Sequence, residues 1–260
     1  MNFEDPPLIP SRWRWLGVGL LGAVLGPCAV AICAQNAGEH SAIRPEPREG
    51  AAMDMHRGFL ERAKQGNVDL LFLGDSITAA WEGRDGDGLG PAQVWDRHYA
   101  PRNAANFGIG GDRTQHVLWR LGQGEVDGIQ PRVVVLLIGT NNLSGNTPEE
   151  IVEGITAIVR TLKVKLPETK ILLLGIFPRG EKPNPLRDRI AAVNARIKGL
   201  DDGGKTVKYL EIGHLFLNED GTISRDVMPD ALHLTRKAYR IWADAMEPTL
   251  WEMLEGSTRK

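Results

Sequence analysis

Short apolar runs recur along the chain, and each is separated from the next by a longer stretch in which apolar and polar residues mix. Several runs are nearly continuous in Val, Ile and Leu, a pattern typical of strands that are buried on both faces. Strands of that kind belong to parallel sheets with helices above and below. The predicted strands lie at residues 68–73, 104–107, 133–138, 171–176 and 207–212.

The mixed stretches between these runs predict helices. The clearest one should cover residues 148–165, because Thr147 can cap it, Pro148 suits its first position and Glu150 completes a capping box. Alternating strands and helices predict a single α/β domain, a three-layer α/β/α sandwich with a five-stranded parallel sheet. The other predicted helices cover residues 185–198 and residues 235 onward, the latter with a bend at Pro248.

The N-terminal part of the chain has a different pattern. Arg12 and Arg14 precede an uncharged apolar run, which predicts a signal peptide over residues 1–34. The run is also close to the roughly 20 residues that a membrane-spanning helix needs, so an uncleaved anchor remains an alternative. Residues 35–52 are polar and contain prolines, which predicts a flexible linker before a folded domain over 53–260. We therefore expect a secreted or periplasmic protein, or a membrane-anchored one if the segment is retained.

Composition narrows the class of partner. The chain has 260 residues, 42% of them apolar and 25% charged, with a net charge of -2. Nothing in these values favours nucleic acid or an anionic membrane surface. Both cysteines, Cys28 and Cys33, lie in the N-terminal apolar run. Cleavage would leave no thiol, which excludes a disulfide framework and a cysteine nucleophile.

Polar residues follow four of the five predicted strands. Ser76 comes after the first strand, a glycine-rich stretch at 108–112 after the second, Asn141 after the third, and Asp230 with His233 after the fifth. In a parallel sheet the carboxyl ends of the strands meet at one edge, and ligand sites form there. The sequence therefore predicts that these groups share one site.

The groups at this edge suit acyl transfer. A serine hydroxyl needs a base to accept its proton, and His233 is the natural base for Ser76. Asp230 can accept a hydrogen bond from the other ring nitrogen of His233. The tetrahedral intermediate carries an oxyanion, which the backbone N–H groups of Ser76 and Gly111 and the side-chain amide of Asn141 can stabilise.

Each of these signals has a plainer interpretation when it stands alone. Ser76 can simply cap a helix, and the glycine loop can hold a cofactor phosphate. Asn141 suits a turn, and a lone His233 is commonly structural. The combination at successive strand ends favours the active site.

Other polar and aromatic features have predicted structural roles. Asp75 is expected to cap the helix after the first strand rather than to perturb the site. The basic residues at positions 179, 182, 187 and 189 are interleaved with acidic ones, which indicates a solvated loop or a dimer contact. Core packing is predicted for Trp81, Trp95 and Trp119.

The four blocks resemble those of the SGNH (GDSL) hydrolases, with "GDSIT", "GIGGD", "GTNN" and "DALH" in this chain. The likeness covers roughly residue 70 to the C-terminus. The stretches "NFGIGGDRTQHVLWRL" and "PRGEKPNPLR" look most like the catalytic subunits of intracellular platelet-activating factor acetylhydrolases and their bacterial relatives. The commonest family form has Gly-x-Asn-Asp where this chain has "GTNN". The resemblance implies the flavodoxin-like SGNH hydrolase fold.

The resemblance also assigns roles to residues. It implies Ser76 as nucleophile, His233 as base and Asp230 as the partner that orients the base. Family members need no metal or organic cofactor, and some form dimers, so we expect no cofactor and allow a homodimer. The implied oxyanion hole comprises Ser76, Gly111 and Asn141, and the implied acyl pocket comprises Ile77, Thr140 and Leu232.

These observations predict a serine esterase that removes short acyl groups, with acetyl expected, from a small lipid or a carbohydrate. One alternative is a longer-chain lipase or lysophospholipase, which needs a wider acyl cleft. Another is a carbohydrate-binding or lipid-binding module on the same fold that has no catalytic activity.

Overall fold

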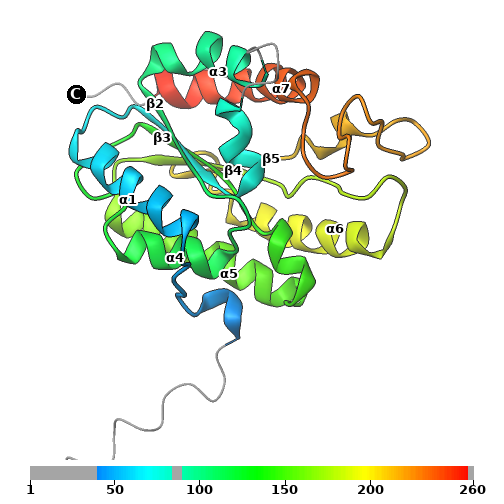
Figure 1. The fold of residues 1–260 in the computed structure, drawn as a ribbon, viewed down its shortest axis with the longest axis horizontal. Helices are drawn as coiled ribbons and strands as arrows, with labels where there is room; N and C mark the ends of the chain where they lie inside the picture. Colours follow the sequence, from blue (N-terminus) through cyan, green and yellow to red (C-terminus); the bar gives the residue numbers. More distant parts are fainter. Residues whose placement is uncertain (1–39, 84–89, 257–260) are drawn as a thin grey trace, which may run out of the picture. The chain divides into compact units, whose positions relative to one another are not determined.

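The computed structural model describes residues 40–83 and 90–256. Its centre is a five-stranded parallel sheet with the order β2-β1-β3-β4-β5 (Figure 1). The prediction of five parallel strands is confirmed, and each strand lies within two residues of its predicted start. The strands are β1 (Leu70–Gly74), β2 (Ala104–Gly108), β3 (Val133–Leu137), β4 (Lys170–Leu174) and β5 (Val207–Leu210).

Helices cover both faces of the sheet, as Figure 1 shows. One face carries α1 (Ala51–Lys64), α4 (Thr114–Gly122), α5 (Pro148–Lys165) and α6 (Pro185–Ile197). The other carries α3 (Ala92–His98) and α7 (Arg236–Glu255), and the short α2 (Ser76–Ala79) follows β1 directly. The three-layer α/β/α arrangement predicted from the sequence is therefore correct. The 3-10 turns are η1 (Ser41–Ile43), η2 (Ala80–Glu82), η3 (Ala100–Arg102), η4 (Thr140–Ser144), η5 (Lys198–Leu200) and η6 (Gly213–Phe216).

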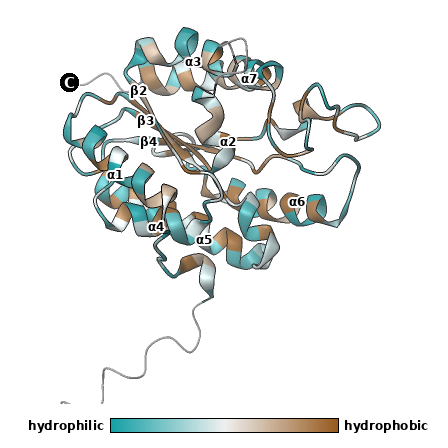
Figure 2. Cartoon of the chain, viewed as in Figure 1, coloured by the Kyte–Doolittle hydropathy of each residue, from teal (hydrophilic) through white to brown (hydrophobic). Residues whose placement is uncertain are grey.

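The strands are apolar throughout because each one contributes to two cores. Leu71 and Leu73 of β1 pack towards α1, α4 and α5, whereas Leu70 and Phe72 pack towards α3 and α7. Figure 2 shows hydrophobic strands inside and hydrophilic residues on the outer faces of the helices. The continuous apolar runs in the sequence therefore reflect burial on both faces.

The core on the α7 side is rich in aromatic rings. Trp81 is completely buried, and its ring centroid lies 4.7 Å from that of Trp242 and 5.1 Å from that of Tyr99. Trp95 is also buried, so packing roles are confirmed for Trp81 and Trp95. Trp119 packs edge-on against His56 of α1 at 5.1 Å on the opposite side of the sheet.

The order of the strands fixes where a site can form. β1 pairs with β2 on one side and with β3 on the other, so the chain reverses its direction of winding at β1. Loops on opposite sides of the sheet separate at such a point, and ligands bind at the carboxyl ends of the strands there. Gly74 ends β1, and a Cβ at this position would clash with the carbonyl oxygen of Leu137 and with Thr78 Oγ1. Glycine therefore lets the chain turn into α2 at the sheet edge.

Helix boundaries follow the predicted capping signals closely. Thr147 Oγ1 accepts the backbone N–H of Glu150 at 3.3 Å, and Glu150 Oε2 accepts the backbone N–H of Thr147 at 3.1 Å. The predicted capping box is therefore present at the start of α5. Helix α7 continues through Pro248, where the sequence predicts a bend.

The predicted linker over 35–52 is wrong for its described part. Residues 40–50, which we call the N-terminal strap, pack on α4 and α5 ahead of α1. Ala42 is fully buried, and its carbonyl oxygen accepts a hydrogen bond from Thr114 Oγ1 at 2.7 Å. The Glu46 amide donates to the Gln115 carbonyl at 3.2 Å. These contacts join the strap's backbone to the rest of the folded unit. The unit therefore begins at Glu39 rather than at Met53.

The predicted signal peptide or anchor over 1–34 lies outside the described residues. Within residues 40–83 and 90–256, no helix has the length and apolar character needed to cross a membrane.

Candidate active site

Ser76 lies at the first position of α2, directly after the sharp turn at the end of β1. The preceding residue, Asp75, is the helix cap, because its carboxylate accepts the backbone N–H of Ile77 at 3.0 Å. The interpretation of Ser76 as the cap is therefore wrong, and the predicted capping role of Asp75 is correct. Ser76 is half-buried and its hydroxyl remains available for other contacts.

A histidine and a carboxylate continue from Ser76 in a line of hydrogen bonds. His233 Nε2 lies 3.0 Å from Ser76 Oγ, and His233 Nδ1 lies 2.6 Å from Asp230 Oδ2. Both residues lie in the loop before α7, more than 150 residues from Ser76 in sequence. The fold thus brings together the three residues that the sequence selected as a triad.

Asp230 is held in the form that can support a charged imidazole. Burial opposes its charge, but hydrogen bonds from the His233 side chain and from the backbone N–H groups of His233 and Leu232 lower the pKa of Asp230 to about 2. The two backbone bonds, at 2.7 and 3.0 Å, also fix the orientation of the carboxylate. Asp230 is therefore ionised at neutral pH.

Asp75 has the opposite electrostatic environment. Burial raises the pKa of Asp75 to about 7; the bond from the Ile77 N–H opposes the shift, and the charge of Asp112 adds to it. A buried carboxyl group with a raised pKa thus directly precedes Ser76 in the chain. Asp75 is therefore both the cap of α2 and a buried carboxyl group whose pKa is raised.

The glycine-rich stretch after β2 forms a tight turn. The amide of Asp112 donates to the carbonyl of Ile109 at 3.1 Å, and Gly111 has φ +80. This is the position that a type II turn reserves for glycine. A Cβ built on Gly110 would lie 3.8 Å from Ser76 Cβ, so the turn passes close to Ser76.

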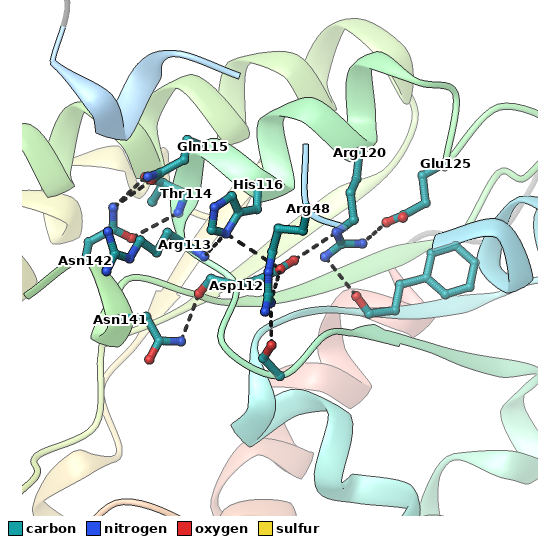
Figure 3. A network of polar contacts seen from close by, with 12 residues as sticks. Arg48, Asp112, Arg113, Thr114, Gln115, His116, Arg120, Glu125, Asn141 and Asn142 are labelled. Atoms are coloured by element: carbon teal, nitrogen blue, oxygen red, sulfur yellow. Dashed lines mark hydrogen bonds and ion pairs between the residues drawn. The ribbon is translucent and has the colours of Figure 1, made fainter. Parts of the chain in front are cut away.

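Asn141 reaches the same turn from η4 after β3. Its Nδ2 donates to the Asp112 carbonyl at 2.9 Å (Figure 3). A side-chain amide nitrogen carries two N–H groups, so one remains for a further acceptor. Asn141 and Gly111 therefore lie next to each other at the carboxyl edge of the sheet, as predicted.

The residues predicted to line the acyl pocket are buried or half-buried. Ile77 and Thr140 are 3% and 2% exposed, and Leu232 is half-buried. Thr140 accepts hydrogen bonds from Arg179 Nη1 at 3.3 Å through both its carbonyl and its hydroxyl. A cavity of about 290 Å³ lies beside His233 instead, and it is lined by Pro91, Pro229, Asp230, His233, Leu234, Thr235 and Arg236.

The basic residues of the "PRGEKPNPLR" stretch and the start of α6 bind backbone rather than solvent alone. Arg187 donates to the carbonyls of Arg179, Gly180 and Gly221. Arg189 donates to the Leu143 carbonyl at 2.7 Å and to that of Asn146. These arginines hold the loops after β3 and β4 in place through hydrogen bonds. The sequence analysis had instead predicted that the basic residues lie in a solvated loop or at a dimer contact.

A buried chain of charges behind the turn was not predicted (Figure 3). Arg120 Nε binds Asp112 Oδ2 at 2.9 Å, and Arg120 also pairs with Glu125. Glu125 Oε2 in turn lies 2.7 Å from His56 Nδ1 on α1. The available signal was that Arg120 falls among the apolar positions of α4, between Leu118 and Leu121.

The described residues contain no cluster of three or more His, Cys, Asp or Glu side chains that could hold a metal ion. At the carboxyl edge of the sheet, Ser76, His233 and Asp230 form one line of hydrogen bonds.

Comparison with known proteins agrees with this geometry. The sequence model of the GDSL-like lipase/acylhydrolase family matches residues 72–241. The chain belongs to this family. The GDSL-like assignment confirms the family resemblance seen in the sequence and makes the protein a carboxylic ester hydrolase.

Several GDSL-like relatives share most of the chain. It is 41% identical over 203 residues to the platelet-activating factor acetylhydrolase IB subunit alpha2 of Gallus gallus, covering 78% of this chain and 85% of the relative. It is 36% identical over 221 residues to subunit alpha1 of Homo sapiens, covering 83% and 92%. A solved carbohydrate acetylesterase from Sinorhizobium meliloti has the same fold, with a TM-score of 0.54, 17% identity, and coverage of 72% and 99%.

Proposed function

We propose that the protein hydrolyses short-chain O-esters, with acetyl as the preferred acyl group, through a Ser76–His233–Asp230 triad and an acyl-enzyme intermediate. The observation that carries this proposal is the unbroken line of hydrogen bonds from Ser76 Oγ through His233 to Asp230. Such a line activates a hydroxyl that is otherwise a poor nucleophile.

The reaction begins when His233 Nε2 accepts the proton of Ser76 Oγ as the oxygen attacks the ester carbonyl. Asp230 holds the ring in the required tautomer and stabilises the imidazolium that forms. Collapse of the tetrahedral intermediate breaks the C–O bond, and His233 returns the proton to the departing alcohol. A water molecule, activated by the same His233, then releases the acid from Ser76.

The negative oxygen of the intermediate needs donors that are already in place. Ser76 is the first residue of α2, so its backbone N–H has no partner within that helix. The Gly111 N–H and the second N–H of Asn141 lie beside it in the proposed oxyanion hole. Each such donor accounts for about 3 kcal/mol of transition-state stabilisation in related chemistry.

The preference for a small acyl group is supported by the close packing of Ile77 and Thr140, which are 3% and 2% exposed. Relatives named as acetylhydrolases and acetylesterases support the same choice. On the alcohol side, we propose an acetylated carbohydrate or a small lipid. The cavity beside His233 is a candidate for the alcohol portion.

The test compares p-nitrophenyl esters of increasing chain length with the wild-type protein, Ser76→Ala and His233→Ala. Each variant should lose about 10⁴-fold or more in kcat, because triad members act as a unit. His214→Ala, which changes an exposed histidine in η6, is the matched control and should keep wild-type kinetics. A Ser76→Ala protein that retained full activity would exclude the triad.

The same series separates the alternatives. Octanoate turnover faster than acetate turnover would indicate a longer-chain lipase or lysophospholipase rather than an acetylesterase. Folded protein that fails to react with a fluorophosphonate probe at Ser76 would indicate a non-catalytic binding module. Acetylated sugars, polysaccharides and acetyl phospholipids then identify the alcohol.

A further inference from the structure

Arg48 of the N-terminal strap lies against the outside of the glycine turn (Figure 3). Its Nη1 donates to the Gly110 carbonyl and, at 3.1 Å, to Asp112 Oδ1. A Cβ added to Gly111 would lie 3.3 Å from the same nitrogen. One guanidinium group therefore binds two residues of the turn, Gly110 and Asp112, and lies next to the residue between them.

The peptide between Gly110 and Gly111 links this contact to the proposed oxyanion hole. In a trans peptide the C=O and the following N–H lie in one plane and point in opposite directions. The Gly110 carbonyl faces Arg48, so the Gly111 N–H faces away from it. That N–H makes no hydrogen bond to another residue of the described ranges, and Gly110 is close to Ser76.

Arg48 is itself held in place through Asp112. The two carboxylate oxygens of Asp112 are divided between Arg48 and Arg120, and the backbone carbonyl of Asp112 accepts the Asn141 amide. The side chains of Asp112 and Arg120 are 1% and 3% exposed. Asp112 therefore connects Arg48 to both Gly111 and Asn141.

We propose that Arg48 is a positioning residue for the oxyanion hole: it fixes the Gly110–Gly111 peptide with its N–H directed at the tetrahedral intermediate. This inference rests on the proposed function, because it assigns Arg48 a task in that reaction. Glycines on either side give this peptide unusual freedom to rotate, and the bond to Arg48 opposes that rotation.

The charge of Arg48 also acts along the peptide. A cation that binds the carbonyl oxygen withdraws electron density from the amide, and hydrogen bonds in such a chain strengthen one another. The Gly111 N–H is therefore a better donor to the oxyanion than an ordinary amide. Both effects act where charge develops, so they should change kcat more than KM.

The experiment compares Arg48→Met with Arg44→Met in the full chain. Arg44 is an exposed arginine of the same strap, and its side chain makes no hydrogen bond or ion pair within the described residues. We expect Arg48→Met to lose about 10-fold to 100-fold in kcat on p-nitrophenyl acetate, less than a deleted donor costs. KM should stay within about twofold, and Arg44→Met should match the wild type.

Two further readouts separate positioning from a structural role. A trifluoromethyl ketone, which forms a charged tetrahedral adduct with the serine, should bind Arg48→Met more weakly by about the same factor as kcat falls. Arg48→Lys keeps a cation and should recover part of the lost kcat. Thermal unfolding checks that each variant is folded, and Arg48→Gln, whose amide is too short to reach the turn, replaces the Met variant if that one does not fold.

A folded Arg48→Met or Arg48→Gln protein with wild-type kcat and inhibitor affinity would overturn the inference. So would a loss confined to KM. The proposed function fails separately, if the wild-type protein does not hydrolyse esters or does not depend on Ser76. An active, Ser76-dependent enzyme that is indifferent to Arg48 therefore refutes only the role of Arg48.

Discussion

Asp75 stabilises the fold as a helix cap, but its burial makes its charged form unfavourable. Its side chain caps α2 and so determines how Ser76 leaves the sheet. The same placement buries a carboxyl group almost completely, at 1% exposure. Ionising the group there is unfavourable, which is why its pKa rises from 3.8 to about 7.

We expect this shift to make stability depend on pH. Between pH 3.8 and about 7 the folded protein keeps a proton on Asp75 that the unfolded chain has released. The resulting stabilisation is fully present below pH 3.8 and is lost as the pH rises through about 7. The free energy of unfolding should fall over that interval by up to about 4 kcal/mol through this group.

Asp75→Asn tests this expectation, because asparagine also caps helices but does not titrate. Urea unfolding of both proteins at several pH values from 4 to 8 measures the free energy of unfolding. The wild-type curve should fall relative to the variant's as pH rises. Parallel curves would show that Asp75 keeps its ordinary pKa in the folded protein.

Sequence analysis identified those site residues that belong to a recognisable motif. Ser76, Asp230 and His233 stand in recognisable blocks, and the fold joins them. Arg48 was missed because its partners are 62 and 64 residues away and nothing local marks it. Long-range contacts of a polar side chain leave no periodic signal in the sequence.

At the scale of elements, the strap packs closely on α5 at a position where the helix has a glycine. A Cβ on Gly154 of α5 would lie 2.5 Å from Thr114 Oγ1 and 2.8 Å from the Ala42 carbonyl oxygen. Glycine at this position therefore lets the strap lie directly on the helix, although glycine ordinarily weakens a helix interior.

Gly154→Ala should consequently destabilise the protein by about 1–3 kcal/mol, since the added methyl overpacks the contact. The control is Gly58→Ala in α1, where a Cβ would have nothing within 4 Å. That change should stabilise by about 0.5–1 kcal/mol through helix propensity. Chemical denaturation of the two variants measures both effects, and equal shifts of the same sign would contradict the packing described here.

Elements with a strong pattern were predictable and the strap was not. The apolar runs of β1 to β5 and the capping box at Thr147 each have a local physical cause that the sequence displays. The strap is polar and contains prolines at positions 45 and 47. Its order comes from hydrogen bonds to α4, which composition does not show.

At the scale of the whole molecule, the compact unit extends beyond the family match. The match covers residues 72–241, whereas the compact unit begins at Glu39 and includes Arg48. A chain that starts at residue 51 keeps the proposed triad and loses the strap. We expect it to lose at least about 10-fold in kcat, through Arg48, and to unfold at a lower temperature, through exposed surfaces of α4 and α5.

The comparison protein is a chain that starts at Glu39 and keeps the strap. Esterase assays and thermal unfolding of the two truncated proteins provide the measurements. Equal kcat and equal unfolding midpoints would mean that the strap is dispensable.

The buried charges behind the glycine turn also bear on how the enzyme responds to heat. Ions are hydrated less favourably as temperature rises, so the penalty for keeping Asp112, Arg120 and Glu125 out of water falls on heating. Hydrophobic stabilisation reaches a plateau over the same range. Buried ion pairs therefore hold the turn beside Ser76, and this class of interaction weakens least on warming. We expect the site to stay assembled until the domain as a whole unfolds.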